Sequence, residues 1–284
     1  MSLRLANVAG RASLLLGDVL IDVARAAGGR FSEDPMAALA AWDVFTEWAR
    51  GRGPGDATGP RAPADLGPPV PRPSKVFAIG MNYRAHAAEA KLEIPKSPVV
   101  FTKFPNCIGG PFADVELYSD RVDWEIELVV VIGRRGRRIA EKDALAHVAG
   151  YTVGQDVSDR RMQFADKPPQ FSLGKSLDGY GPTGPALVTL DAFRDPNDLG
   201  LTCDVGGERM QDGRTADMVF PVAPLVAYLS RWCTLEPGDL IFTGTPAGVG
   251  STRDPRRYLA PGEEIVSTIE GIGTMRNRCV AAPA

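Results

Sequence analysis

The chain has 284 residues, of which 44% are hydrophobic and 24% are charged, an ordinary composition for a globular protein. Its formal net charge of -3 and pI of about 5.6 remove the electrostatic basis for binding nucleic acid or an anionic membrane. No apolar run reaches transmembrane length, and Gly17-Asp18 interrupt the run Leu14–Leu16, so we expect no membrane span and no signal peptide. The four cysteines form no Cys-x-x-Cys pair, which predicts free thiols in a reducing cytoplasm.

The N-terminal residues alternate between apolar runs and turn residues, a pattern typical of short strands. Three strands are predicted, over residues 3–8, 12–16 and 19–24. Asp34-Pro35 is typical of a helix start, with Asp as the N-cap and Pro at the first helical position. The predicted helix continues to Arg50.

Residues 51–73 are rich in Gly, Pro and Ala and have little periodicity, as expected of a linker or a surface segment. We therefore predict a small N-terminal module with its linker at residues 1–70. The main domain then occupies residues 71–284.

The main domain combines short strands and glycine-containing turns with only brief helices. Strands are predicted over 75–80, 99–103, 123–133, 151–155, 186–189, 240–243 and 264–269. A hairpin is predicted over 201–211, around Gly206-Gly207. Helical patterns cover 84–92, 144–148 and 220–232, and 158–165 is predicted as a loop or helical turn. This sequence of elements predicts a mixed α/β, β-rich fold built as a closed or sandwich-like β roll.

Carboxylates occur at the start of the predicted strand 123–133. Because alternate side chains of a strand share a face, Glu125 and Glu127 are expected to point one way, and Trp124 and Ile126 the other. Asp156 follows the next predicted strand and could reach the same place. Buried carboxylates repel one another unless a cation lies between them, and three hard oxygen ligands suit Mg²⁺ or Mn²⁺. A solvated carboxylate face on an edge strand is the alternative.

His86 follows a strand-ending turn and precedes Glu89 by three residues. On a helix this spacing lets the carboxylate approach the imidazole, fix its tautomer and raise its basicity. Such a pair can take a proton from water. The alternative is an ordinary surface histidine.

Two further features could contact a small anionic ligand. Lys175 follows residues 171–174, predicted as a short apolar strand, and could project a cation into a cleft to stabilise an oxyanion. In the loop 243–250, backbone N–H groups and the Thr245 hydroxyl could hold a carboxylate. Each feature also has an ordinary structural interpretation, as a surface lysine and a tight turn.

The order of these segments resembles the fumarylacetoacetate hydrolase family, and in particular its acylpyruvase-like branch acting on 2,4-diketo acids. The matching segments are Gly80–His86, Asp123–Leu128, Gly150–Ser158, Gln163, Leu173–Ser176, Gln211–Phe220 and Thr243–Gly250. They cover residues 75 to 270. The resemblance implies the family's β-sandwich roll with a small N-terminal module, and a homodimer.

The resemblance also implies site residues and a chemistry. Glu125, Glu127 and Asp156 correspond to ligands of Mg²⁺ or Mn²⁺. His86 and Glu89 correspond to a pair that activates water, on a segment that often acts as a lid. Lys175 corresponds to an enolate contact and a catalytic residue. The implied substrate contacts are Arg84, Gln163 and Thr245.

The implied function is a metal-dependent hydrolase that cleaves a C–C bond of a 2,4-diketo acid through a metal-bound enolate. An oxaloacetate-type decarboxylase, a hydroxymuconate-type isomerase and a non-catalytic dicarboxylate binder are the alternatives. Two departures from the family pattern bear on the substrate. Asp159-Arg160-Arg161 replace a common Ala-Arg-Asp, and Gly179 stands where some members have threonine.

Overall fold

Strand β11 (Ile126–Ile132) lies at the centre of the fold, and all of its side chains are buried. Its even-numbered residues, such as Leu128, belong to one hydrophobic core. Val129 and Val131 belong to another. In this computed structural model, which describes residues 2–60 and 66–283, the strand therefore separates two cores. Glu125 and Glu127 precede Val129 on the odd-numbered face.

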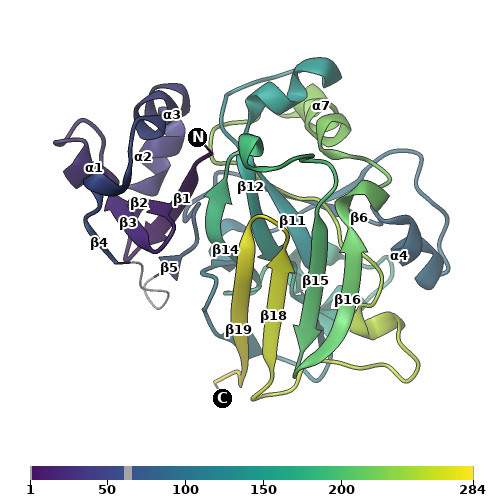
Figure 1. Cartoon of the computed structure of the whole chain (residues 1–284). Helices are drawn as coiled ribbons and strands as arrows, with labels where there is room; N and C mark the ends of the chain where they lie inside the picture. The colour runs from purple at the N-terminus through teal and green to yellow at the C-terminus, as the bar shows by residue number, and fades with distance from the viewer. Residues whose placement is uncertain (1, 61–65, 284) are drawn as a thin grey trace.

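The strand belongs to a large mixed sheet with the order β4-β3-β2-β1-β14-β12-β11-β17-β6-β7, to which β5 and β8 add at β1 and β14. Its other strands are β1 (Arg4–Val8), β2 (Arg11–Leu16), β3 (Val19–Asp22), β4 (Gly59–Pro60), β5 (Leu66–Gly67), β6 (Val76–Gly80), β7 (Val99–Thr102), β8 (Ile108–Gly109), β12 (Val148–Gln155), β14 (Gly181–Val188) and β17 (Leu240–Phe242). The sheet extends from the N-terminal residues on the left of Figure 1 through the centre of the molecule.

A second sheet, with the order β16-β15-β18-β19-β9, packs on the even-numbered face of β11. Its strands appear in front in Figure 1. They are β9 (Val115–Leu117), β15 (Gly200–Val205), β16 (Glu208–Arg214), β18 (Glu264–Ile269) and β19 (Gly273–Ala281). The two layers form the sandwich-like roll that the sequence predicted. A short ribbon joins β10 (Val122–Asp123) to β13 (Ser158–Asp159).

The helices are short and lie around the sheets. The α-helices are α1 (Val23–Ala26), α2 (Pro35–Ala40), α3 (Trp42–Arg50), α4 (Arg84–Glu89), α5 (Arg160–Gln163), α6 (Phe171–Gly174) and α7 (Val222–Trp232). The 3₁₀ turns are η1 (Pro54–Asp56), η3 (Pro105–Cys107), η4 (Glu141–His147), η5 (Leu190–Ala192), η6 (Thr215–Asp217) and η7 (Gly250–Thr252). Within residues 2–60 and 66–283, no helix is long and apolar enough to cross a membrane.

The three predicted N-terminal strands are present, with small changes at their ends. The third strand ends at Asp22, because the carboxylate of Asp22 caps α1 by accepting the N–H of Arg25. Asp34 caps α2 as predicted. The single predicted helix is interrupted at Ala41 and forms α2 and α3 instead.

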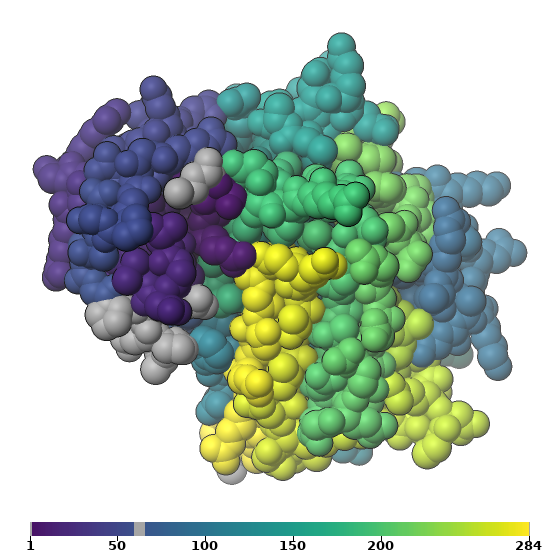
Figure 2. Space-filling model, in the orientation of Figure 1, coloured from purple at the N-terminus to yellow at the C-terminus, as the bar shows by residue number. Residues whose placement is uncertain are grey.

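The N-terminal strands join the main sheet directly. In β1, Leu5 pairs with Leu187 of β14, and Phe45 of α3 packs in the same core as Val131. Figure 2 shows the N-terminal residues packed against the main body, with the α4 segment on the opposite side. The predicted linker supplies β4 and β5; its residues 61–65 lie outside the described part. The division of the chain near residue 70 stays a prediction about folding units.

Three local predictions in the main body are wrong. The strand predicted over 123–133 is divided, because Asp123 of β10 pairs with Ser158 of β13 and β11 begins only at Ile126. Residues 171–174 form helix α6 rather than a strand, because Gln170 accepts the N–H of Ser172 and starts a helical turn. Residues 144–148 lie mostly in the 3₁₀ turn η4 rather than in an α-helix. The predicted fold class is confirmed.

Candidate functional site

Three buried carboxylates meet where β11 begins and β12 ends. Strand pairing places Ile126 opposite Gln155, and Asp156 donates its N–H to the carbonyl of Glu125 at 2.9 Å. As a result, oxygen atoms of Glu125, Glu127 and Asp156 all lie within 4.8 Å of one another. The structure thus brings together the three residues that the sequence predicted as metal ligands.

Two buried lysines contact this carboxylate cluster. Nζ of Lys175 lies 2.7 Å from Oε2 of Glu125 and 2.6 Å from Oδ2 of Asp156. Nζ of Lys103 lies 2.7 Å from the other Asp156 oxygen and donates to the carbonyls of Lys175 and Tyr180. The sequence pointed to Lys175 but missed Lys103. The only local signal for Lys103 is its position directly after a strand, and that position is common for lysine.

Arg160 is a third cation at the cluster. Its Nε lies 2.8 Å from Asp123, its Nη2 lies 2.5 Å from Glu125, and its Nη1 donates to Gln163 at 2.8 Å. Asp123 therefore orients Arg160. The sequence indicated Arg160 only as part of Asp159-Arg160-Arg161, a segment that differs from the family pattern.

The local charges fit a bound divalent cation. Burial, reinforced by the charges of Asp156 and Glu125, raises the pKa of Glu127 well above its ordinary value. Burial also acts to raise the pKa of Glu125, but Lys175 and Arg160 outweigh it and lower that pKa to about 2. Four buried carboxylates here face three buried cations, which leaves one unbalanced negative charge if all are ionised. These carboxylates are Asp123, Glu125, Glu127 and Asp156, and the cations are Lys103, Arg160 and Lys175.

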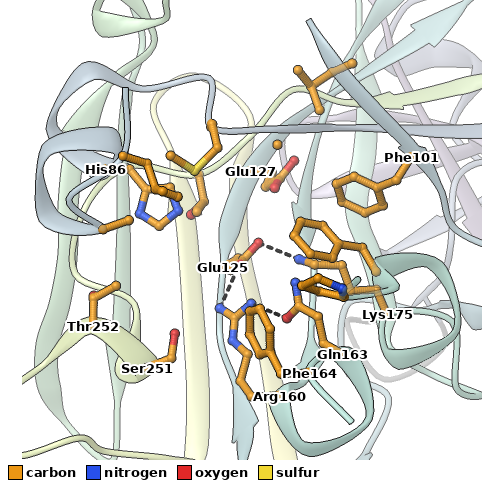
Figure 3. A pocket seen from close by; sticks show the side chains of 18 residues that line it. His86, Phe101, Glu125, Glu127, Arg160, Gln163, Phe164, Lys175, Ser251 and Thr252 are labelled. Carbon is orange, nitrogen blue, oxygen red and sulfur yellow. Dashed lines mark hydrogen bonds and ion pairs between the residues drawn. The ribbon is translucent and has the colours of Figure 1, made fainter. Parts of the chain in front are cut away.

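The predicted His86–Glu89 pair forms on helix α4. Nδ1 of His86 lies 3.3 Å from Oε2 of Glu89. The other imidazole nitrogen does not face Glu89, and His86 lines the same cavity as Glu125 and Glu127. In Figure 3, His86 lies across the cavity from Lys175, with Glu125 between them.

The loop 243–250 holds carboxylates, but they belong to the protein itself. Gly244 donates its N–H to Glu127 at 2.7 Å, Gly248 to Glu89 at 3.0 Å, and Gly250 to Asp123 at 2.7 Å. These three N–H groups are therefore not free for a ligand carboxylate, and a ligand contact by the rest of the loop stays a prediction. The loop positions the acidic side chains of the site.

The predicted substrate contacts differ in their placement around the cavity, which has a volume of ≈ 300 Å³. Gln163 and Thr245 line it. The Thr245 hydroxyl donates to the carbonyl of Ile126 at 2.8 Å and accepts from Gln211 at 2.7 Å. Arg84 is exposed and is not one of the lining residues. The roles of these residues toward a substrate stay predictions.

Fold and site together define a class of proteins in which a β roll holds a cluster of carboxylates that could bind a metal ion, beside a histidine that lines the same cavity. Residues 75–280 match the family described as fumarylacetoacetate (FAA) hydrolase C-terminal. Because the match spans more than half of the chain, this chain belongs to the fumarylacetoacetate hydrolase family. The predicted family is confirmed.

The names of individual relatives state several different activities. Oxaloacetate tautomerase FAHD2A, mitochondrial, from Homo sapiens is 46% identical over 223 residues, which are 78% of this chain and 71% of the human protein. A Mycobacterium smegmatis crystal structure is 48% identical with a TM-score of 0.93, covering 100% of both chains. Maleylpyruvate hydrolase from Sphingobium sp. SYK-6, in complex with manganese(II) ion and pyruvate, is 29% identical with a TM-score of 0.83 and covers 99% of this chain and 100% of its own.

Proposed function

We propose that this chain hydrolyses a C–C bond of a 2,4-diketo acid of the acylpyruvate type, with Mg²⁺ or Mn²⁺ as cofactor. The observation that carries the proposal is the His86–Glu89 pair facing the carboxylate–lysine floor across one cavity. A hydrolysis needs a base for water on one side of the substrate and positive charge for an oxyanion on the other. The cavity offers both.

Glu125, Glu127 and Asp156 would hold the divalent cation. When bound, such an ion polarises the keto oxygen of a substrate and stabilises negative charge on it. The three carboxylates are kept in place by Lys103, Arg160 and loop N–H groups, so they need little rearrangement to act together.

His86 takes a proton from water through the nitrogen that does not face Glu89. The hydroxide forms a bond to the distal carbonyl carbon, and the bond between that carbon and the neighbouring CH₂ breaks. The products are a carboxylic acid and the enolate of pyruvate, which gains a proton at carbon. Lys175 places its ammonium beside the enolate oxygen, and Gln163 and Thr245 are the proposed substrate contacts within the cavity.

Pyruvate release from acetylpyruvate tests the proposal directly. Metal-stripped protein should release almost no pyruvate, and added Mg²⁺ or Mn²⁺ should restore the rate. Equal rates in chelator and in metal, or no pyruvate from any 2,4-diketo acid, would overturn the hydrolase proposal. The relative rates with the two ions also report which one the site prefers.

Oxaloacetate chemistry is the second candidate, favoured by the 46% identity to an oxaloacetate tautomerase. Moving a proton between carbon and oxygen of a keto acid also requires a base such as His86 and a site for enolate charge. The decay of enol-oxaloacetate absorbance, measured beside pyruvate release from both substrates, separates tautomerisation, decarboxylation and hydrolysis. A homodimer and a cytoplasmic location are further proposals, and light scattering of the purified protein tests the dimer.

A further inference from the structure

The cavity has two chemically different parts. Its floor carries the charged and polar groups of the site, among them Glu125, Glu127 and Lys175. Its apolar wall is formed by Met81, Leu92, Phe101, Phe164, Pro169 and Phe171, while His86, Ser251 and Thr252 also line the cavity. A keto acid whose head lies on the floor would extend its distal substituent along this wall.

The apolar wall is built from aromatic rings that support one another. The ring centroids of Phe101 and Phe171 lie 5.7 Å apart, and those of Phe164 and Phe171 lie 6.2 Å apart, both in edge-to-face geometry. Phe164 is nevertheless 54% exposed, and Leu92 on the facing segment after α4 is 58% exposed. Large apolar side chains that remain this exposed around a cavity are available to a ligand.

The cations of the cavity are already paired. Among its lining residues, all within the described ranges, the only arginine and lysine are Arg160 and Lys175. Arg160 is held by Asp123 and Glu125, and Lys175 by Glu125 and Asp156. A carboxylate that lies against the aromatic rings would therefore find no free lysine or arginine in this lining, which is unfavourable.

We propose that the distal substituent of the substrate is an uncharged apolar group, an alkyl chain or an aryl ring, and not a second carboxylate. The proposal rests on the proposed function, because it places a 2-keto acid head on the carboxylate floor. The preferred substrate would therefore differ from small or doubly charged acids, because these acids place no apolar group against the aromatic wall.

The first test compares two 2,4-diketo acids of equal length with Mg²⁺ present. One carries a propyl tail, and the other has a carboxylate in place of the terminal methyl group. Because apolar pockets discriminate by about tenfold or more per group, we expect kcat/KM to favour the propyl compound by at least about tenfold. Equal values, or a preference for the diacid, would overturn the apolar subsite.

The second test measures binding without turnover. Oxamates, which are unreactive analogues of 2-keto acids, carry an N-butyl or an N-carboxypropyl tail, and calorimetry gives each Kd with Mg²⁺ present. Tighter binding of the N-butyl compound supports the subsite even if no diketo acid is hydrolysed, in which case only the hydrolase proposal fails. If a diketo acid is hydrolysed but the carboxypropyl compound binds more tightly, the hydrolase proposal stands and the apolar subsite is contradicted.

The third test changes the wall itself. Phe164→Arg introduces a cation at an exposed position on the wall and should reduce the propyl-to-diacid ratio by about tenfold. Leu173→Arg is the matched control, because Leu173 is 52% exposed on the same segment but does not line the cavity. An unchanged ratio in Phe164→Arg, or an equal reduction in both variants, contradicts the assignment of the wall.

Discussion

Gly248 donates its backbone N–H to the carboxylate of Glu89 at 3.0 Å. This bond connects helix α4, which carries His86, to the loop whose other N–H groups hold Glu127 and Asp123. The proposed proton-accepting pair and the cation site thus share one loop. Changes in that loop are expected to affect both parts of the site.

Replacing Glu89 by Gln should lower kcat by about a hundredfold or more, since a positioned acid–base group contributes that much. The amide oxygen can still accept the Gly248 N–H, so the fold should persist and KM should change little. Steady-state kinetics with a diketo acid checks the effect. A variant with normal kcat would show that the carboxylate does not assist His86.

The same variant should also change how stability depends on pH. Burial acts to raise the pKa of Glu89, but hydrogen bonds from His86 and Gly248 help to bring it below the ordinary value of 4.5. A carboxylate with a lowered pKa stabilises the folded state above pH 4.5, and this contribution disappears as the pH falls through the folded-state pKa. Denaturant unfolding should show a difference between wild type and Glu89→Gln at neutral pH that narrows below pH 4.5.

Glu127→Gln should weaken Mn²⁺ binding by about a hundredfold or more, because even outer contacts of a metal site change affinity by 10- to 100-fold. Calorimetric titration of metal-stripped protein measures this. Glu93→Gln removes the same charge at an exposed position after α4 and should bind Mn²⁺ like the wild type. Equal losses in the two variants would point to overall charge and not to coordination.

Lys103→Met should lower the free energy of unfolding by about 3 kcal/mol or more, because it leaves a buried carboxylate without one of its partners. In a double-mutant cycle with Asp156→Asn, in chelator, the coupling should exceed about 1 kcal/mol. The exposed ion pair of Arg161 and Asp120 is the comparison, and its coupling should be near zero. Additive effects at Lys103 and Asp156 would argue against a direct pairing.

Gly250→Ala should destabilise the fold by about 2 kcal/mol or more and impair activity. A Cβ at this position would lie 1.9 Å from the carbonyl oxygen of Arg257 and 2.8 Å from Oδ1 of Asp123. Gly55→Ala adds the same methyl group where no atom lies within 4 Å, so its melting temperature should stay close to that of the wild type. Thermal unfolding of both variants decides the matter.

A chain of residues 71–284 should fail to unfold cooperatively. The truncation removes β1, which uncovers the edge of β14. It also removes α3, whose Trp42 and Phe45 belong to the same hydrophobic core as Val129 and Val131. Circular dichroism and a denaturant titration of the truncated protein test this. A sharp two-state transition would instead establish the main part as an independent domain.

The amino-acid sequence by itself determined which residues share a face and where several elements begin, among them α2 at Pro35 and α4 at Arg84. Strand alternation placed Glu125 and Glu127 together, helical spacing placed Glu89 beside His86, and Asp34-Pro35 marked a helix start. These are local relationships, set by backbone geometry over a few residues. They survive in the folded chain.

The tertiary structure alone decided the partners of these groups. Lys103 reaches Asp156 across 53 residues, and Gly250 reaches Asp123 across 127. No local pattern encodes such contacts, because Lys103 follows β7 and Asp156 follows β12, and β11, β17 and β6 lie between these two strands in the sheet. For the same reason, only the tertiary structure shows that Gly244, Gly248 and Gly250 of the loop 243–250 bind the protein's own acidic side chains.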